Sequence, residues 1–144
     1  MKLRLQTDYA LRVLIYLARC DERTRVDAVA EAFQISREHL VKVAQALVRH
    51  GWIETKAGRG GGMRLTADSD KLDVATVIGA FEGREGVLEC VAEPTVCVLE
   101  PGCHLRRKLI SAEAAFYREL EGTTLADLVA KPRAGSGLSR LPLN

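Results

Sequence analysis

The sequence contains no apolar run that approaches the roughly 18 residues that a membrane-spanning helix needs. Lys2 and Arg4 precede a short apolar stretch, Val13–Ala18, but Arg12 and Arg19 bound it closely and no small-residue cleavage site follows. We therefore expect neither a membrane partner nor a signal peptide. The predicted location is the cytoplasm, where thiols stay reduced, so clustered cysteines favour metal or redox chemistry over disulfides.

Motifs of catalysis and of nucleotide binding are also missing. The glycine-rich segment before Met63 lacks the Gly-x4-Gly-Lys-Ser/Thr pattern, and no helical pattern follows it directly. No nucleophile–base constellation and no pair of catalytic acids is recognisable. At 144 residues the chain has room for one domain with a core of ordinary size. We expect a protein that is not an enzyme.

A strong net charge is absent, since the whole chain carries only +2. The charge is divided unevenly, however. Residues 1–66 hold twelve Lys and Arg against seven Asp and Glu, whereas residues 67–130 hold six against twelve. This asymmetry favours an anionic partner, most simply nucleic acid, for the N-terminal half. The excess is modest, so the prediction depends on the architecture.

Helical periodicity dominates the N-terminal half. The first predicted helix covers Thr7–Arg19, with Thr7 as N-cap and Asp8 in the first turn, where the helix dipole favours a carboxylate. It is apolar on more than one side, which hints at a dimer contact. A second helix spans about Val26–Phe33, and a tight turn leads to a third that Ser36 caps and that ends near His50. The predicted inner face of the third helix is Leu40, Val43, Ala44, Leu47 and Val48.

Two short helices joined by a tight turn, the second with a polar outer face, are typical of a helix-turn-helix. In such modules the start of the second helix enters the major groove of DNA. Arginine can form two hydrogen bonds with one guanine, whereas lysine and serine more often bind phosphates. The alternative is a solvated helix face on an unrelated helical domain. The residues expected nearest to DNA are Ser36, Arg37, His39 and Lys42.

A β-hairpin is predicted directly after these helices. Its strands are Trp52–Thr55 and Met63–Thr66, and the glycine-rich segment Lys56–Gly62 joins them. A hairpin in this position is the wing of a winged helix. Glycine lets the backbone approach phosphates closely, and an arginine at the tip suits a narrow minor groove. The wing residues expected at DNA are Lys56, Arg59 and Gly60.

The C-terminal half is predicted to contain a connecting helix over Leu72–Phe81, a loop over residues 84–104 and a long helix after it. The long helix carries an apolar stripe whose simplest partner is a second copy of the chain. Packing on its own domain is the alternative, but a palindromic DNA site also favours a two-fold dimer. The stripe consists of Leu105, Leu109, Ala112, Phe116 and Leu120.

Cys90, Cys97 and Cys103 share one fourteen-residue segment with the spacing C-x6-C-x5-C. Three thiols on one loop suit an iron–sulfur cluster or zinc. The spacing matches neither paired C-x2-C zinc sites nor ferredoxin runs, and an open or weak fourth position favours a reactive cluster. Cys103 lies just before a helix, whose dipole favours the thiolate. Cys20 stands alone and is expected to be a small buried apolar residue.

The fourth ligand is open at this point. His104 is adjacent to Cys103, which makes shared coordination awkward, and the nearby glutamates are solvated by default. Two further functions use the same thiols: a small electron carrier with an iron–sulfur cluster, and a regulator whose cysteines sense oxidants as bare thiols or hold zinc.

Three stretches resemble the Rrf superfamily of winged-helix regulators. They are TDYALRVLIYLA near the start, SREHLVKVAQALVRHGWIETKAGRGGGMRL across the helix-turn-helix and wing, and ECVAEPTVCVLEPGCHL around the cysteines. Together they cover about residues 1–130. The resemblance is best to the nitric-oxide-sensing repressors of that superfamily.

This resemblance implies that Cys90, Cys97 and Cys103 hold an iron–sulfur cluster, [4Fe-4S] being favoured over [2Fe-2S]. It also implies that Asp8, reaching across a homodimer, is the fourth ligand. The implied function is repression of nitric oxide detoxification genes from a palindromic operator in double-stranded DNA, with nitric oxide as the signal that releases it. Cluster-biogenesis regulators of the superfamily are the alternative, but they have a ligand histidine where this chain has Arg106.

The predicted fold is therefore mainly α, with a small β-hairpin wing. Residues 1–66 form the winged helix-turn-helix, and residues 67–104 form the connecting helix and cluster loop. Residues 105–130 form the dimerisation helix and an end turn, and residues 131–144 form a disordered tail.

Overall fold

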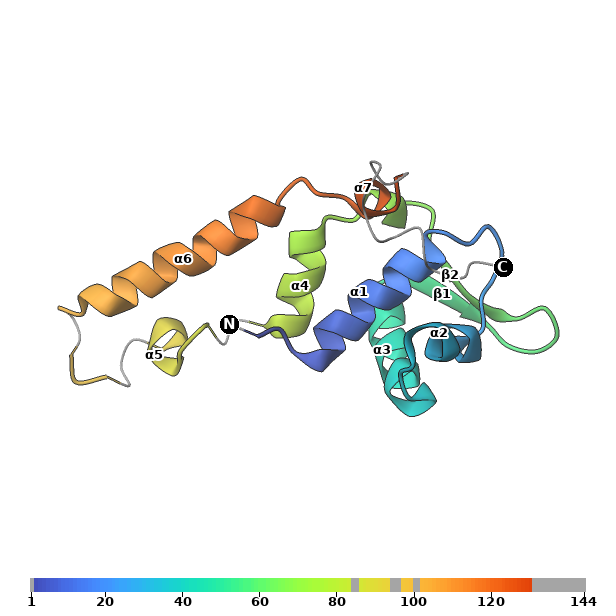
Figure 1. Cartoon of the computed structure of the whole chain (residues 1–144), viewed down its shortest axis with the longest axis horizontal. Helices are drawn as coiled ribbons and strands as arrows, with labels where there is room; N and C mark the ends of the chain where they lie inside the picture. The colour runs from blue at the N-terminus through green and yellow to red at the C-terminus, as the bar shows by residue number, and fades with distance from the viewer. Residues whose placement is uncertain (1, 84–85, 94–96, 100–101, 131–144) are drawn as a thin grey trace.

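The computed structural model describes residues 2–83, 86–93, 97–99 and 102–130, so the predicted tail lies outside the described residues. The described chain is mainly helical with one two-stranded antiparallel hairpin, as predicted (Figure 1). None of its helices is long and apolar enough to cross a membrane. The elements are α1 (Leu5–Leu17), α2 (Val26–Phe33), α3 (Arg37–Arg49), β1 (Ile53–Lys56), β2 (Gly62–Leu65), a 3₁₀ helix η1 (Ser69–Lys71), α4 (Val74–Glu82), α5 (Glu89–Ala92), α6 (His104–Leu120) and α7 (Leu125–Val129).

Helices α2 and α3 form the predicted helix-turn-helix. Gln34, between them, adopts a left-handed conformation with φ 55°, which makes the turn tight. The Ser36 hydroxyl accepts the backbone N–H of His39 and so caps α3, as predicted. The inner face of α3 buries Leu40, Val43, Ala44 and Leu47 against α1. Val48 was expected on that face, but it is 39% exposed, because it lies at the edge of the packed stripe.

Helix α1 begins earlier than the sequence pattern indicates. Arg4 is its N-cap, and the Arg4 carbonyl accepts the N–H groups of Thr7 and Asp8. The prediction of Thr7 as N-cap is therefore wrong: Thr7 is fully buried inside the helix, and its hydroxyl donates to the Glu82 carboxylate. The same carboxylate accepts the Arg4 N–H at 2.9 Å. Asp8 lies in the first turn, as predicted.

The hairpin pairs Ile53 with Leu65 and Lys56 with Gly62, within one residue of the predicted strands. Met63 also exchanges two backbone hydrogen bonds of 2.8 Å with Thr24, so the segment before α2 lies along the second edge of β2. A Cβ added to Gly62 would lie 2.8 Å from the Thr24 carbonyl oxygen, so the close approach of these two segments requires glycine.

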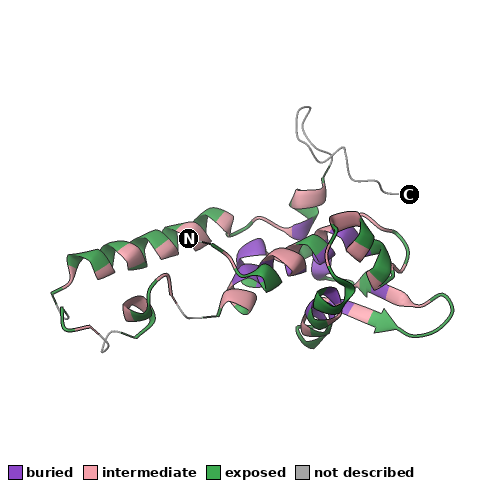
Figure 2. Ribbon diagram, turned by 60° about the horizontal axis from the view of Figure 1, so that its bottom comes forward, coloured by how far each residue is buried: buried purple, intermediate pink, exposed green. Residues whose placement is uncertain are grey.

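The core of the winged helix continues into the C-terminal half. Asp73 caps α4 by accepting the Thr76 N–H, and the helix buries Val77 in the same core as α1 and α3. Helix α7, which the sequence predicts as a final turn, buries Leu125 there too. Buried residues gather where α1, α3 and α4 meet (Figure 2). The boundary at residue 66 stays a prediction.

Helices α5 and α6 reach away from this core (Figures 1 and 2). No residue of α6 is fully buried. The segment predicted as a loop before α6 contains the short helix α5, so that part of the prediction is wrong. The reason is Arg106 of α6, whose side chain donates to the carbonyls of Cys90 at 2.5 Å and Val91 at 3.4 Å. Capping of the last carbonyls by an arginine stabilises such a turn.

Candidate nucleic-acid interface and cysteine site

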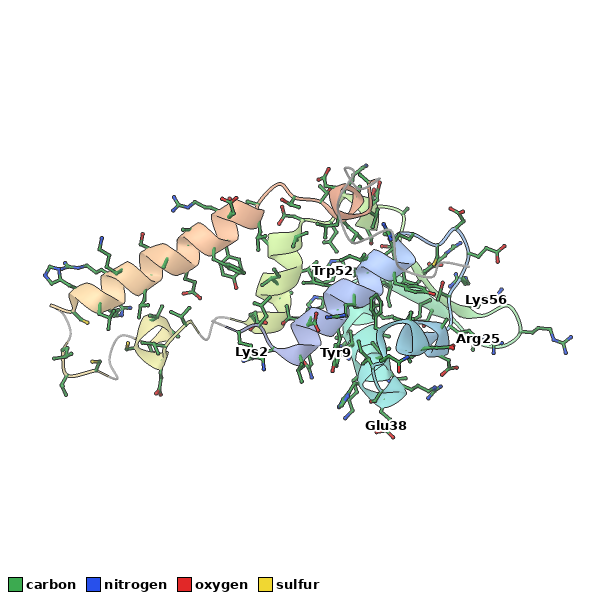
Figure 3. The ribbon with its side chains drawn as sticks, in the orientation of Figure 1. Lys2, Tyr9, Arg25, Glu38, Trp52 and Lys56 are labelled. Carbon is green, nitrogen blue, oxygen red and sulfur yellow. The ribbon has the colours of Figure 1, made fainter. Side chains whose placement is uncertain are left out.

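A cationic hollow of about 280 Å³ lies between the start of α2, the start of α3 and the hairpin. Arg25, Arg37 and Lys56 line it, and Asp27 lies among them. Figure 3 labels Arg25 and Lys56 at this end of the molecule. The start of the recognition helix and the wing, predicted separately as DNA contacts, therefore border one surface.

The residues predicted on the recognition helix are all exposed. Ser36 Oγ lies 3.1 Å from His39 Nδ1, and the His39 ring lies 6.2 Å from the Tyr9 ring of α1. Arg37 Nε donates to Asp27 Oδ1 at 2.8 Å. Helix α1 packs on α3. A contact of His39 with DNA would therefore also affect the position of α1.

The wing residues Lys56, Arg59 and Gly60 are exposed too, and Gly60 has φ 71°. Arg64 of β2 and Arg23, which precedes α2, both bind Glu54. The hydrogen bond from Arg64, followed by that from Arg23, lowers the pKa of Glu54. Because Glu54 neutralises part of that charge, Lys56 and Arg59 are the wing cations better suited to phosphates.

Arg25 is the residue that sequence reasoning missed. It is the N-cap of α2 and lines the cationic hollow beside Arg37 and Lys56. Its position immediately before a helix could have suggested it, because phosphate contacts gather at helix N-termini. Its proximity to the wing comes from the pairing of Thr24 with Met63, which no local pattern indicates.

The three predicted ligand thiols lie at the far end of the molecule from the hairpin (Figure 1). Cys90 is on α5, Cys97 lies in the described segment 97–99, and Cys103 is the N-cap of α6. All three are free and partly exposed. Cys103 Sγ accepts the Arg106 N–H at 3.4 Å, and the Arg106 side chain holds the Cys90 carbonyl. Arg106 therefore brings together the segments of two of the three cysteines.

The structure does not complete a metal site from these residues. Within the described ranges, no three His, Cys, Asp or Glu side chains converge as metal ligands. Asp8 lies on α1 and accepts the Arg12 Nε–H at 2.8 Å. The residues present do offer the donor atoms that an iron–sulfur cluster needs, because three free thiols lie on one segment. One of these thiols is at the start of a 17-residue helix, where the dipole favours thiolate. Cys20 is half-buried and packs against the core, away from this segment.

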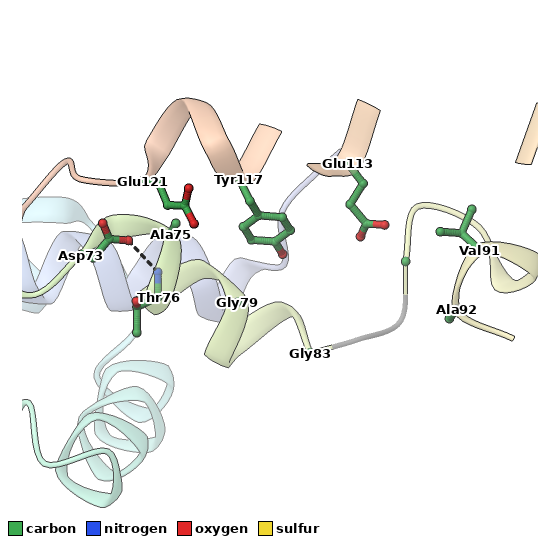
Figure 4. A pocket seen from close by; sticks show the side chains of 11 residues that line it. Asp73, Ala75, Thr76, Gly79, Gly83, Val91, Ala92, Glu113, Tyr117 and Glu121 are labelled. Atoms are coloured by element: carbon green, nitrogen blue, oxygen red, sulfur yellow. Dashed lines mark hydrogen bonds between the residues drawn. The ribbon is translucent and has the colours of Figure 1, made fainter. Parts of the chain in front are cut away.

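A second hollow, of about 710 Å³, separates α6 from α4 and α5 (Figure 4). Tyr117 points from α6 toward Gly79 of α4. Burial, and then the charges of Glu113 and Glu82, raise the pKa of Tyr117. Asp73, Glu113 and Glu121 give this hollow an acidic lining.

Such a fold, with a helix-turn-helix, a hairpin wing and a cationic surface between them, defines the class of winged-helix DNA-binding regulators. The chain belongs to the Rrf2 family, because the model of that family, described as an iron-dependent transcriptional regulator, matches residues 3–131. The expectation of a transcriptional regulator and not an enzyme is confirmed by this membership and by the names of the relatives.

Two relatives are both named HTH-type transcriptional regulator NsrR. The chain is 41% identical to that of Bacillus subtilis strain 168 and 42% identical to that of Geobacillus kaustophilus strain HTA426, in each case over 132 residues that cover 90% of both chains. The predicted resemblance is confirmed at this level: within the family, the chain is similar to regulators named NsrR.

Solved structures confirm the fold. The global cysteine regulator CymR of B. subtilis is similar with a TM-score of 0.74 at 24% identity, covering 92% of this chain and 99% of that one. IscR of T. potens is similar with a TM-score of 0.72 at 18% identity, covering 90% of this chain and 86% of that one.

Proposed function

We propose that this regulator is a homodimeric repressor that binds a palindromic operator in double-stranded DNA and releases it in response to nitric oxide. The observation that carries the proposal is the placement of three free thiols on one segment of a winged-helix chain, with Arg106 holding the segments of two of them together. The description of the family model as iron-dependent supports iron as the metal.

The DNA-binding part of the proposal rests on the cationic hollow and its borders. Arg25, Arg37 and Lys56 surround it, and Arg59 extends the positive charge onto the wing. Cations so placed neutralise phosphates, and the start of α3 is the part that enters the major groove. Ser36, His39, Lys42 and Gly60 complete the proposed contact set.

The dimer part rests on α6. Leu105 of the stripe is 63% exposed, and none of the helix is fully buried by its own chain. A 17-residue helix with an apolar stripe gains free energy when a second copy covers the stripe. Two recognition helices would then have to match half-sites about 34–36 Å apart.

Cys90, Cys97 and Cys103 would hold an iron–sulfur cluster, with Asp8 of the second subunit as the fourth ligand. When bound, the cluster would supply iron that reacts with nitric oxide. The chain's own residues suggest how a change at Asp8 reaches the DNA-binding part. Asp8 accepts from Arg12, whose guanidinium lies 5.5 Å above the Phe33 ring of α2. Engagement or release of Asp8 therefore alters the contact between α1 and the helix-turn-helix.

The size of the required effect is small. A hundredfold loss of operator affinity corresponds to about 2.7 kcal/mol of differential binding. A small shift of one recognition helix relative to the other weakens contacts on both half-sites, which is enough to supply this difference.

The test measures affinity for a duplex that the protein selects from a random-sequence pool, before and after stoichiometric nitric oxide. Anaerobically purified wild-type protein should lose about a hundredfold in affinity. Cys97→Ala should bind with the same affinity in both conditions, while the matched control Cys20→Ala should respond like the wild type. Equal operator affinity of the wild-type protein before and after nitric oxide would contradict the proposal.

A further inference from the structure

The start of the recognition helix carries an ion pair with a defined geometry. Arg37 is the first residue of α3, and Asp27 is in the first turn of α2. The Arg37 Nε–H donates to Asp27 Oδ1 at 2.8 Å. The side chains remain 66% and 65% exposed, and both line the cationic hollow. The pair is therefore at the proposed DNA surface and not in the core.

The nitrogen through which Arg37 binds Asp27 determines which of its N–H groups remain for another partner. A guanidinium has five N–H donors in a planar fork, of which Nε supplies one. With Nε held by Asp27, the two terminal nitrogens remain for another partner. A pair of N–H groups in one plane matches the O6 and N7 acceptors of guanine. A side chain that is already oriented also loses less rotamer freedom when it binds.

The negative charge of Asp27 is unfavourable for binding to DNA phosphates. Among the described residues that line the hollow, Asp27 is the one acid beside Arg25, Arg37 and Lys56. A carboxylate there repels phosphates and so weakens binding to any sequence. Exposed ion pairs also contribute little to folding stability. The helix dipole of α2 favours a carboxylate in its first turn, but that role does not require the acid to face the cationic hollow and to bind Arg37. This position is explained if Asp27 increases discrimination between sequences.

We propose that Asp27 is a positioning residue that orients Arg37 to read one guanine in each half-site. Asp27 touches no base itself; it fixes the guanidinium through Nε and, by its charge, weakens binding to unrelated DNA. This inference rests on the proposed DNA-binding function and adds to it the chemical identity of one recognised base.

The experiment uses the duplex selected by the full-length wild-type protein and a set of duplexes in which each base pair is changed in turn. Arg37→Lys identifies the base pair that Arg37 reads, because lysine keeps the charge but lacks the planar fork. Asp27→Ala removes both the charge and the acceptor for Nε, whereas Asp27→Asn removes only the charge. Asp68→Ala is the matched control, since Asp68 is an exposed acid paired with Lys71 at 3.9 Å away from the hollow.

The expected result has two parts. Asp27→Ala loses about fivefold or more of the preference at the G·C pair that Arg37→Lys identifies, and Asp27→Asn keeps most of it. Both Asp27 variants bind unrelated DNA more tightly than the wild type, and Asp68→Ala behaves as the wild type in both assays.

Three results overturn the inference. Asp27→Ala could keep the full preference, Asp27→Asn could lose as much as Asp27→Ala, or Arg37→Lys could leave the preference unchanged at every base pair. A wild-type protein that enriches no sequence from the pool would instead overturn the DNA-binding proposal, and this inference with it.

Discussion

Glu82 is the residue through which the end of α4 holds the start of α1. Its carboxylate accepts the Arg4 N–H at 2.9 Å and the hydroxyl of the buried Thr7. It replaces the side-chain cap that α1 lacks. The cysteine segment follows α4 in the chain. The Glu82 carboxylate therefore links α4, the helix before this segment, to α1, the helix that bears Asp8.

Replacing Glu82 by alanine should destabilise the protein by about 1–2 kcal/mol, since one helix N–H and one buried hydroxyl lose their acceptor. Glu82→Gln keeps one acceptor oxygen and should cost less than half as much. Urea unfolding of the two variants measures the difference. Equal stability of the wild type and Glu82→Ala would show that the carboxylate does not hold α1.

Glu54 gives a pH-dependent prediction. Hydrogen bonding to Arg64, and then to Arg23, lowers its pKa in the folded state below the ordinary value of 4.5. A carboxyl group whose pKa is lower in the folded state stabilises the fold above its unfolded pKa, and this contribution is lost as the pH falls through the folded pKa. The stability difference between the wild type and Glu54→Gln should therefore be constant above about pH 5 and shrink below pH 4.5. Urea midpoints measured across this range check it; a difference that stays the same down to pH 2 would contradict it.

At the scale of single elements, the hairpin depends on two glycines in different ways. Gly62 has φ 143°, and an added Cβ would lie 2.8 Å from the Thr24 carbonyl oxygen, whereas Gly58 has φ 86° with open space around it. Gly58→Ala should cost about 1–2 kcal/mol for the backbone conformation alone. Gly62→Ala should cost more, because the Thr24 segment must also move. Unfolding measurements that rank the two variants in the opposite order would refute this account of the wing.

Helix α6 supports a prediction about assembly. Leu109→Glu places a charge in the apolar stripe and should convert the dimer to monomer, since a buried unpaired carboxylate is costly. Ser111→Glu adds the same charge on the opposite side of the helix and should leave the dimer intact. Sedimentation velocity distinguishes the two. A dimer of unchanged stability in Leu109→Glu would show that the stripe does not form the interface.

Elements that depend on local sequence patterns were predictable, and contacts between distant segments were not. Helix α2, the Ser36 cap and the bounds of the two strands follow from periodicity, capping and glycine placement, and they agree with the structure within a residue. The start of α1 was predicted wrongly because its cap comes from Glu82, 75 residues or more away. Helix α5 was missed because it depends on Arg106. The proposed cysteine ligands stay predictions.

The described part of the molecule has two ends, to which we assign DNA binding and the cluster. The hairpin and the starts of α2 and α3 form the cationic end, and α5 with the start of α6 forms the cysteine end (Figure 1). Helices α1 and α4 lie between them and share one core with α3. In the proposed regulation, a change at the cysteine end would reach the DNA-binding end through this shared core, because packed helices shift as units. The proposed regulation requires no contact between the two ends.

The most direct test is a native mass spectrum of the anaerobically purified protein, recorded before and after stoichiometric nitric oxide. The account predicts a dimer that carries the mass of one iron–sulfur cluster per subunit and that gains iron-nitrosyl adducts. The cluster mass also distinguishes [4Fe-4S] from [2Fe-2S]. A dimer that carries zinc or no metal, unchanged by nitric oxide, would contradict the account and leave a winged-helix regulator that answers to another signal.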